Sequence, residues 1–275
     1  MHHPTAHRFG DTYVSQRVNQ SAHATVYRGR RGDADVACKV YAADRSARLD
    51  ERIRRECALQ SSIDHPCLAP LVEWGRTESG AAYAVSPWID GPTLRERLNA
   101  GPIPWPELRP LAADLAGALR AIHERAALHR DVKPSNVVLR RPAPPERRAR
   151  AVLLDLGHAL LSDETRLTAT GMTVGTPAYM APEQATGQPV DARADLYSLG
   201  VVLYEALTGQ RPFIGTTLAE IVEQCQTQPI ERPSLRGADV PRSVEDLVLW
   251  LLEKDPQRRA PSTHVLIHAL ASTSA

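Results

Sequence analysis

One short stretch of the chain places three chemically different side chains at fixed offsets. Residues 129–136 read His-Arg-Asp-Val-Lys-Pro-Ser-Asn, so a carboxylate, a cation and an amide share one loop. Asp131 could accept a proton from an attacking hydroxyl, Lys133 could steady a moving phosphoryl group, and Asn136 could hold a metal ion. The spacing therefore indicates phosphoryl transfer, with a plain polar turn around Pro134 and Asn136 as the alternative.

A lysine follows a short apolar run at Val36-Ala37-Cys38-Lys39. An ammonium among apolar neighbours needs a counter-charge, because burying it unpaired is costly. Glu56, which lies in a segment with helical periodicity, is the candidate partner. Taken singly, Lys39 could instead protect an edge strand, and Glu56 could be one of many glutamates on a charged helix.

The stretch 129–136 resembles the catalytic loop H-R-D-x-x-x-x-N of protein kinases. A lysine two residues after the aspartate, here Lys133, is typical of the serine/threonine branch of that family. Residues 36–39 are similar to the V-A-I-K strand, whose lysine grips the α- and β-phosphates of ATP. Glu56 matches the glutamate that pairs with this lysine when its helix swings in. Asp155-Leu156-Gly157 resembles the D-F-G magnesium motif with Leu for Phe, and a plain turn is the alternative.

A later segment strengthens the resemblance. Residues 175–183, Gly-Thr-Pro-Ala-Tyr-Met-Ala-Pro-Glu, resemble the G-T-x-x-Y-x-A-P-E segment that closes the activation loop. The resemblance implies a buried, structural ion pair between Glu183 and Arg259. It also implies that Asp195 anchors the backbone of the catalytic loop. A simple helix N-cap is the other role considered for Asp195, and both roles can hold together.

The segment between Asp155 and Glu183 is rich in threonine. The resemblance places a loop phosphate against Arg130, since a phosphothreonine offers oxygens that an arginine can meet bidentately. We expect autophosphorylation in trans by a second copy, and an ordinary threonine-rich loop is the alternative. The candidate regulatory residues are Arg130, Thr168, Thr170 and Thr173, and the segment also holds Thr165.

The resemblance implies an ATP site in which apolar side chains hold the adenine and Asn136 and Asp155 hold Mg²⁺ or Mn²⁺. Backbone groups near Pro87 and Trp88 would read the edge of the base, and Ser86 would be a small gatekeeper. The remaining residues assigned to the nucleotide are Lys39, Glu56, Val18, Val26, Ala37 and Val138. The apolar ones could equally be plain core.

Three features depart from the family pattern, and the small gatekeeper Ser86 is one of them. Asn19, Ser21 and Ala24 occupy the three positions of the glycine-rich loop, where glycine allows close backbone approach to phosphate. We expect the hairpin that covers the phosphates to be stiffer, and nucleotide affinity to be weaker or turnover slower. Gln60 stands where relatives carry a small or apolar residue, which predicts a looser active arrangement.

The elements that must position these groups fall into two parts. The resemblance implies an α+β, two-lobed protein kinase fold, with a β-rich N-lobe at 9–86, a hinge at 87–91 and a mainly helical C-lobe at 92–270. Alternation predicts a hairpin at 25–29 and 35–41 and short strands at 71–76 and 81–85, and helical periodicity predicts helices at 45–62, 108–125, 194–208 and 244–254. The biased segment 140–150 predicts an exposed loop.

Composition excludes several classes. The chain has 275 residues and a formal net charge of +1, which gives no reason to expect nucleic acid or an anionic membrane as partner. Its four cysteines show no metal-binding spacing and predict reduced thiols in the cytoplasm. No stretch predicts a signal peptide or a membrane span. We assign His2, His3 and His7 to a mobile terminus rather than to a metal site.

The resemblance runs from about Phe9 to Leu270 and is to bacterial, eukaryotic-like (Hanks-type) serine/threonine kinases. It implies transfer of the γ-phosphoryl group of Mg-ATP to serine or threonine hydroxyls of proteins. The missing glycines keep open a pseudokinase scaffold that binds nucleotide and partner proteins. A small-molecule kinase would share the lobes but lack the segment 175–183.

Overall fold

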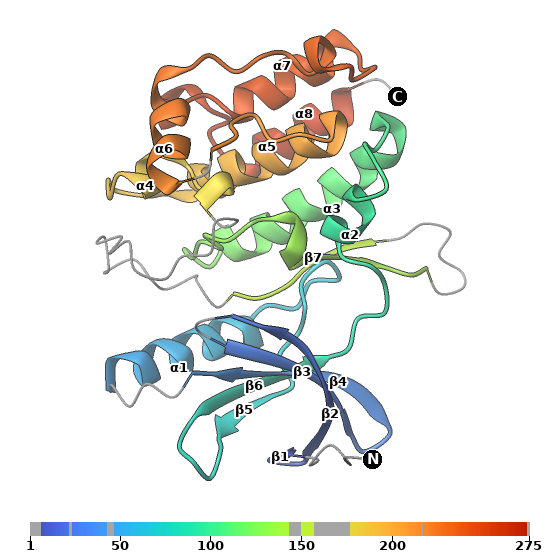
Figure 1. Cartoon of the computed structure of the whole chain (residues 1–275), viewed down its shortest axis with the longest axis vertical. Coiled ribbons are helices and arrows are strands. Elements are labelled where there is room, and N and C mark those ends of the chain that lie inside the picture. Colours follow the sequence, from blue (N-terminus) through green and yellow to red (C-terminus); the bar gives the residue numbers. More distant parts are fainter. Residues whose placement is uncertain are drawn as a thin grey trace. The chain divides into compact units, whose positions relative to one another are not determined.

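The computed structural model describes residues 7–21, 24–42, 47–142, 150–156, 177–215 and 217–273. The chain forms two compact units, residues 1–89 and 90–275, called here the N-terminal and C-terminal units. Figure 1 shows a β-sheet with one helix in the first unit and mostly helices in the second.

The sheet of the N-terminal unit is antiparallel, with the strand order β1-β2-β3-β4-β6-β5. Its strands are β1 (His7–Phe9), β2 (Thr12–Gln20), β3 (Ala24–Arg31), β4 (Ala34–Tyr41), β5 (Glu73–Arg76) and β6 (Ala82–Pro87). Strand β4 lies between β3 and β6, so the edge-strand alternative for Lys39 is wrong.

Strand β1 was not expected, and the assignment of His7 to a mobile terminus is wrong. His7 pairs with Val14 of β2. The physical reason is Phe9, whose ring centroid lies 5.8 Å from that of Tyr83 and 6.3 Å from that of Tyr27. This aromatic packing gives the short strand the burial that its sequence length alone cannot supply.

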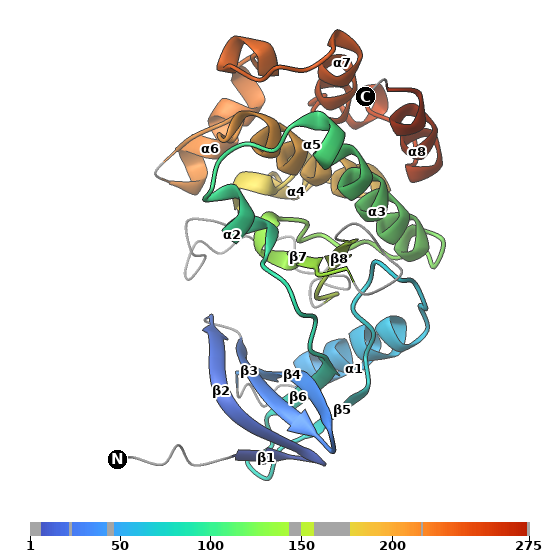
Figure 2. The same ribbon diagram turned by 90° about the vertical axis from the view of Figure 1, so that its right-hand side faces the viewer.

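Helix α1 (Ala47–Ser61) lies along one face of this sheet, as Figure 2 shows. Its inward residues Ile53 and Cys57 form a core cluster with Tyr41 and Ala82 of the strands. A separate cluster that includes Cys38 and Val85 fills the other face. Side chains alternate between the faces along each strand, so these two cores fix which residues of β4 point toward α1.

The C-terminal unit is organised around one buried helix. Helix α5 (Ala192–Thr208) packs against α3 (Trp105–His123) and α7 (Arg242–Leu251). A Cβ added at Gly200 would lie 2.8 Å from Cβ of Leu251, so this contact between helices requires glycine. The other helices are α2 (Leu94–Leu98), α4 (Pro182–Ala185), α6 (Leu218–Thr227) and α8 (Thr263–Ser272).

Two short strands, β7 (Val137–Arg140) and β8 (Arg150–Leu153), pair beside these helices. Arg140 lies opposite Arg150, so the ends of the expected loop at 140–150 belong to a hairpin. Residues 143–149, its middle, lie outside the described residues. The pairing matters for function because β7 follows Asn136 directly and β8 ends two residues before Asp155.

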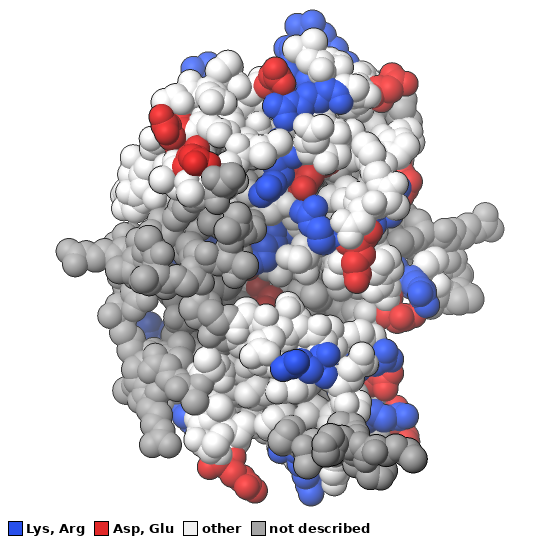
Figure 3. Space-filling view, in the orientation of Figure 1, with Lys and Arg blue, Asp and Glu red and all other residues white. Residues whose placement is uncertain are grey.

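On the face shown in Figure 3, basic and acidic side chains are interspersed rather than gathered by sign. Within the part of the chain that the structure describes, no helix is both long and apolar enough to cross a membrane.

Candidate active site

The side chains of the catalytic-loop stretch meet at one carboxylate oxygen. Oδ2 of Asp131 accepts a hydrogen bond of 2.7 Å from Nζ of Lys133 and one of 2.9 Å from Nδ2 of Asn136. The Asp131 side chain is 8% exposed and that of Lys133 is 18% exposed. Neither bond uses Oδ1, so both donors orient the carboxylate from the same side. The structure thus brings together three residues that the sequence predicts to act together.

Asp195 holds the backbone of this loop from helix α5. Its two carboxylate oxygens accept the N–H groups of His129 and Arg130 at 2.8 and 2.7 Å. The predicted anchoring role of Asp195 is therefore confirmed. The N-cap alternative is wrong, because the N-cap of α5 is Asp191, whose side chain accepts from the Arg193 N–H.

The anchor supports an unusual backbone. Arg130 has φ of 63°, in the left-handed region that non-glycine residues rarely adopt. Such a conformation persists only where surrounding bonds determine it, and the Arg130 N–H bond to Asp195 is one such bond. The turn at Arg130 therefore depends on the carboxylate of Asp195, which belongs to helix α5.

Sequence reasoning missed a third partner of Asp195. Nε2 of His123, the last residue of α3, lies 2.8 Å from Oδ2 of Asp195, and the His123 side chain is 9% exposed. Burial tends to raise the pKa of Asp195, but the hydrogen bond and charge of His123 together with the His129 contacts hold it below its ordinary value. An ionised carboxylate only accepts, so Nε2 of His123 carries the hydrogen and donates.

The β7–β8 pairing brings Leu154, the residue before Asp155, to Asn136. The Leu154 N–H donates to the Asn136 carbonyl at 2.8 Å, and the Leu154 carbonyl lies 2.9 Å from Nε2 of His129. Asp155 itself has φ of 64° and so also adopts the left-handed region. The N–H and the carbonyl of Leu154 thus both hold the turn after β8 to the catalytic loop.

The chemistry of Asn136 and Asp155 fits a hard divalent cation. Nδ2 of Asn136 donates to Asp131, to its backbone carbonyl at 2.9 Å as well as to its side chain. The amide oxygen is therefore the atom left to act as a ligand, and Asp155 adds a carboxylate. Magnesium accepts such a small protein set because it keeps its waters and binds phosphate oxygens.

The predicted ion pair between Glu183 and Arg259 is confirmed. Nη1 and Nη2 of Arg259 reach the two Glu183 oxygens at 2.5 and 2.7 Å, and the side chains are 0% and 4% exposed. The guanidinium also donates to the carbonyls of Glu253, Arg193 and Lys254. This pair fixes the end of the segment 175–183 to the stretch between α7 and α8.

A second buried network in this unit was not expected. The Tyr179 hydroxyl donates to Oε2 of Glu205 at 2.6 Å, and Arg95 of α2 binds both Glu205 oxygens at 3.0 Å. Arg95 also contacts the Tyr179 hydroxyl. Burial and the neighbouring Glu205 carboxylate raise the pKa of Tyr179. The network ties three segments that are far apart in sequence, so no local signal could have revealed it.

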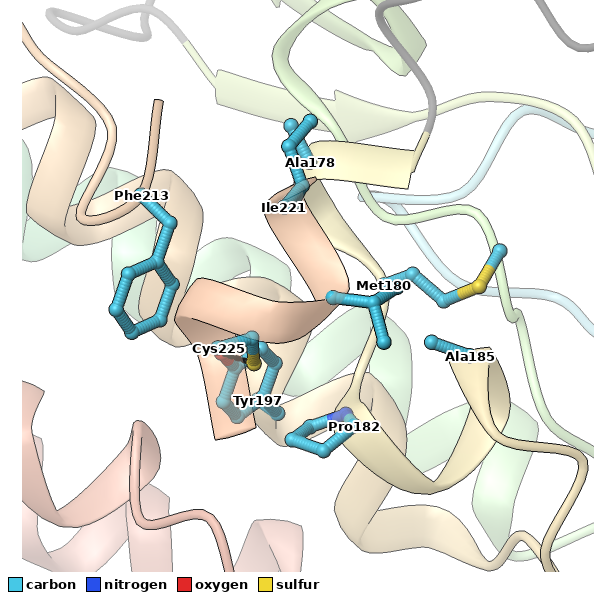
Figure 4. Close-up of a pocket in the computed structure, with 9 residues that line it drawn as sticks. Ala178, Met180, Pro182, Ala185, Tyr197, Phe213, Ile221 and Cys225 are labelled. Atoms are coloured by element: carbon cyan, nitrogen blue, oxygen red, sulfur yellow. Dashed lines mark hydrogen bonds between the residues drawn. The ribbon is translucent and has the colours of Figure 1, made fainter. Parts of the chain in front are cut away.

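An apolar pocket lies between the segment that follows residue 177, helix α5 and helix α6 (Figure 4). Inside it the Tyr197 hydroxyl and Sγ of Cys225 lie 2.9 Å apart. Burial raises the pKa of both groups, so both keep their protons. The lining residues are Ala178, Met180, Pro182, Ala185, Tyr197, Phe213, Ile221, Val222 and Cys225.

In the N-terminal unit, the sheet register places several predicted nucleotide residues on one face. Lys39 pairs with Val26 on β3 and with Ala84 on β6, and Ala37 pairs with Ser86. Directly opposed residues share a face, and residues two apart along a strand do too. Val26, Ala37, Lys39 and Ser86 therefore lie together on the face toward α1.

Helix α1 presents Glu56 on its buried side. Glu56 is 2% exposed, like its neighbour Cys57. Nε2 of Gln60 donates to the Ala69 carbonyl at 2.9 Å, so its amide ties the end of α1 to the following loop. Gln60 thus makes a specific bond at this position, and the Lys39–Glu56 pair stays a prediction.

The other nucleotide candidates have different settings. Val18 is 48% exposed, within an irregular stretch of the β2–β3 pairing. The Trp88 N–H donates to the Asp35 carbonyl at 2.9 Å, and the Arg28 guanidinium lies 4.7 Å from the centre of a Trp88 ring. In the C-terminal unit, Val138 is buried, at 7%.

A serine closes the β2–β3 hairpin, at a place where the family pattern has glycines. The Ser21 hydroxyl accepts from the Ala24 N–H and donates to the Ala24 carbonyl, both at 3.1 Å, and the Ser21 N–H donates to the same carbonyl at 2.8 Å. Ala24 is 9% exposed and belongs to the core cluster of Tyr41 and Ile53. Ala24 is therefore a core residue as well as a hairpin residue.

Several predicted residues lie outside the described residues. They are Gly157, Thr165, Thr168, Thr170, Thr173, Gly175 and Thr176.

Comparison with known proteins decides the family. The family model described as "Protein kinase domain" matches residues 14–271. The chain belongs to the protein kinase domain family. Its two units are the β-rich N-lobe and the helical C-lobe of the kinase fold, as the α+β prediction expects. This family uses ATP and a divalent metal ion.

Curated relatives of this kinase domain are bacterial serine/threonine protein kinases. It is 36% identical over 274 residues to serine/threonine-protein kinase pkn2 of Myxococcus xanthus, covering 96% of this chain and 31% of that protein. It is 36% identical over 232 residues to PknB of Mycobacterium leprae, covering 82% and 36%. It is 36% identical over 265 residues to the DNA damage-responsive kinase RqkA of Deinococcus radiodurans, covering 92% and 38%. The chain thus spans about a third of the length of these relatives.

Proposed function

We propose that this kinase domain transfers the γ-phosphoryl group of Mg-ATP to serine or threonine hydroxyls of proteins. The observation that carries the proposal is the Asp131 carboxylate, held at one oxygen by Lys133 and Asn136 on a backbone fixed by Asp195. A carboxylate ordered before substrate arrives supports positional and electrostatic catalysis, which is most of what phosphoryl transfer needs from a protein.

In the proposed reaction, the substrate hydroxyl oxygen bonds to the γ-phosphorus as the bond to the β–γ bridging oxygen breaks and ADP leaves. Asp131 orients the hydroxyl and accepts its proton, and Lys133 offsets charge on the transferred group. Lys39, paired with Glu56, offsets charge on the α- and β-phosphates. A divalent ion held by Asn136 and Asp155, Mg²⁺ or Mn²⁺, would neutralise phosphate oxygens.

The proposed kinase domain comprises an N-lobe at 9–86, a hinge at 87–91 and a C-lobe at 92–270. Lys39 shares one face of the N-lobe sheet with Val26, Ala37 and Ser86, and this supports the assignment of these residues to nucleotide binding. The further residues proposed to contact the nucleotide are Val18, Val26, Ala37, Ser86, Trp88 and Val138.

Activity is proposed to rise when a second copy phosphorylates the threonine-rich segment at Thr168, Thr170 or Thr173. Arg130 is the proposed partner of that phosphate, and its left-handed backbone at the start of the catalytic loop supports a direct effect on Asp131. Protein substrates and this self-contact are the proposed partners.

The test is incubation with γ-labelled ATP and magnesium, followed by mapping of the labelled residues. Asp131→Asn is expected to lower labelling by about 10²–10⁴-fold. Asp246→Asn, a matched change at a carboxylate that is 54% exposed on α7, is the control and is expected to label like the wild type. Label on Thr168 or Thr170 in the wild type supports the regulatory proposal.

The pseudokinase scaffold is the rival function, supported by the missing glycines at Asn19, Ser21 and Ala24. Nucleotide binding without label in the wild type would favour it over the kinase. The relatives, all named as kinases, do not favour it.

A cytoplasmic location is proposed from the cysteines. All four, Cys38, Cys57, Cys67 and Cys225, are buried and form no disulfide with one another. Burial raises the pKa of Cys38 to about 12, which keeps it a neutral core thiol. Such cysteines suit a reducing compartment.

A further inference from the structure

An aromatic ring lies beside the ammonium of Lys39. Nζ of Lys39 is 5.1 Å from the centroid of the Tyr41 ring. The two residues are two apart on β4, so both side chains point to the face of the sheet that α1 covers. A cation within about 6 Å of a ring centroid is attracted by the electrons of the ring face.

The Tyr41 ring is fixed in place by the helix. Tyr41 is 9% exposed and forms one core cluster with Ile53 and Cys57 of α1 and with Ala24 and Ala82 of the sheet. A ring packed on several sides cannot swing away, so it offers the ammonium a constant position. The attraction is also stronger at a partly desolvated site than at the surface.

The same part of α1 carries Glu56. This residue follows Ile53 by one turn, precedes Cys57, and is 2% exposed. The helix segment that packs on the Tyr41 ring is therefore the one that presents the carboxylate.

We propose that Tyr41 is a positioning residue for Lys39, whose ammonium it holds on the α1 side of the sheet before nucleotide arrives. Tyr41 acts only through Lys39, and the inference rests on the proposed function in that Lys39 meets ATP phosphates. Preordering the ammonium removes part of the entropy cost of gripping them. The competing account is that Tyr41 only fills the core.

The first experiment measures ATP affinity by calorimetry in a double-mutant cycle. Tyr41→Leu removes the aromatic face and keeps an apolar contact, and it is expected to weaken ATP binding by about 3- to 30-fold. In a Lys39→Met background the same change is expected to cost less than about twofold, because no cation remains to be positioned. Tyr41→Phe keeps the ring and is the conservative variant expected to restore binding.

Equal losses in both backgrounds would mean that Tyr41 serves the core alone, and would overturn the proposal. So would unchanged or tighter binding in Tyr41→Leu. If the leucine variant melts at a lower temperature than the wild type, Tyr41→Met replaces it. Methionine has about the volume of leucine, and its flexible, unbranched side chain adapts better to the shape of the core.

The second experiment needs no nucleotide. The chain has three lysines, Lys39, Lys133 and Lys254, so acylation by an amine-reactive reagent can be followed at each by mass spectrometry. Lys254, in the C-terminal unit, donates to the carbonyls of Gln226 and Gln228 and serves as the internal standard. Loss of the ring is expected to raise Lys39 labelling relative to Lys254 by about threefold or more.

The two experiments separate the inference from the proposed function. Unchanged Lys39 labelling in Tyr41→Leu would overturn the positioning role directly. Raised labelling together with ATP affinity that ignores Lys39→Met would support the contact with the ring and contradict the proposed role of Lys39 in the kinase reaction.

Discussion

The catalytic loop of the C-terminal unit and the β2–β3 hairpin of the N-terminal unit are built in opposite ways. The loop is held from distant elements, since Asp195 binds the N–H groups of His129 and Arg130, and Leu154, just after β8, binds Asn136 and His129. Within the loop, Lys133 and Asn136 orient Asp131. The hairpin is closed locally, by Ser21 and Ala24. Its strand pairing is also irregular near Val18.

The difference teaches where this chain needs fixed geometry. The residues proposed to handle the transferred group lie on a backbone held by long-range bonds, one of them at Arg130, whose backbone is left-handed. The proposed cover of the nucleotide depends on contacts within a few residues. We therefore expect changes around the loop to abolish turnover and changes in the hairpin to adjust nucleotide affinity.

The largest effect is expected from Asp195→Ala. This substitution leaves the N–H groups of His129 and Arg130 without an acceptor. Each lost hydrogen bond lowers the free energy of unfolding by about 1–3 kcal/mol. The left-handed turn at Arg130 loses its support, so kcat is expected to fall by about 100-fold or more. Chemical denaturation and initial-rate assays measure the two effects.

Asp191→Ala is the matched control, at the N-cap of the same helix. It removes a cap worth about 1 kcal/mol and is expected to leave kcat unchanged. Equal losses of kcat in both variants would contradict the anchoring role of Asp195.

Asp195 also predicts a pH dependence. Its pKa is lower in the folded chain than its ordinary value of 3.8. Its contribution to stability is therefore fully present above that value and is lost as the pH falls through the folded pKa. The stability gap between the wild type and Asp195→Ala should thus persist at neutral pH and narrow only below about pH 4. A gap that closes near pH 6 would contradict this.

Breaking the Glu183–Arg259 pair is expected to act mainly on stability. Arg259→Met leaves the Glu183 carboxylate buried without its cation, which costs about 3–5 kcal/mol in unfolding free energy. The adjacent Arg258, whose side chain is 70% exposed, supplies the control, and Arg258→Met should change stability by less than about 0.5 kcal/mol. Similar melting temperatures for the two variants would exclude a structural role for the pair.

A smaller effect is expected at His123. His123→Leu removes the donor to Asp195 but leaves both backbone bonds in place, so kcat should fall by about tenfold. His123→Gln can still donate and should recover most of the rate. If Gln and Leu behave alike, the hydrogen bond contributes nothing and only the volume of His123 matters.

The smallest effect is expected in the hairpin. Ser21→Gly releases the Ala24 N–H and allows closer backbone approach to phosphate, which should lower the KM for ATP by about threefold. Ala24→Gly is the contrasting change, and should instead destabilise the core by about 1 kcal/mol. Steady-state kinetics at varied ATP and thermal melting distinguish the two.

The sequence predicts those features whose residues carry their own chemistry. Asp131, Lys133 and Asn136 stand in one short motif, and the resemblance pairs Glu183 with Arg259 correctly. It does not predict His123 beside Asp195, 72 residues away, or Arg95 beside Glu205, 110 residues away. Such contacts arise from helix packing, which leaves no local pattern.

Strand β1 and the N-cap of α5 were missed for different reasons. A three-residue strand is too short for alternation to reveal, and its stability comes from Phe9 packing on Tyr83. At α5, Asp191 and Asp195 both suit an N-terminal turn, and only the bonds of Asp195 to the catalytic loop separate their roles.

The comparison of the loop with the hairpin is tested most directly by one set of steady-state measurements at varied ATP on Asp195→Asn and Ser21→Gly. We predict that Asp195→Asn lowers kcat by about tenfold or more with little change in the KM for ATP, and that Ser21→Gly shifts this KM with kcat kept within about twofold. A shift in KM alone for Asp195→Asn, or a loss of kcat for Ser21→Gly, would contradict it.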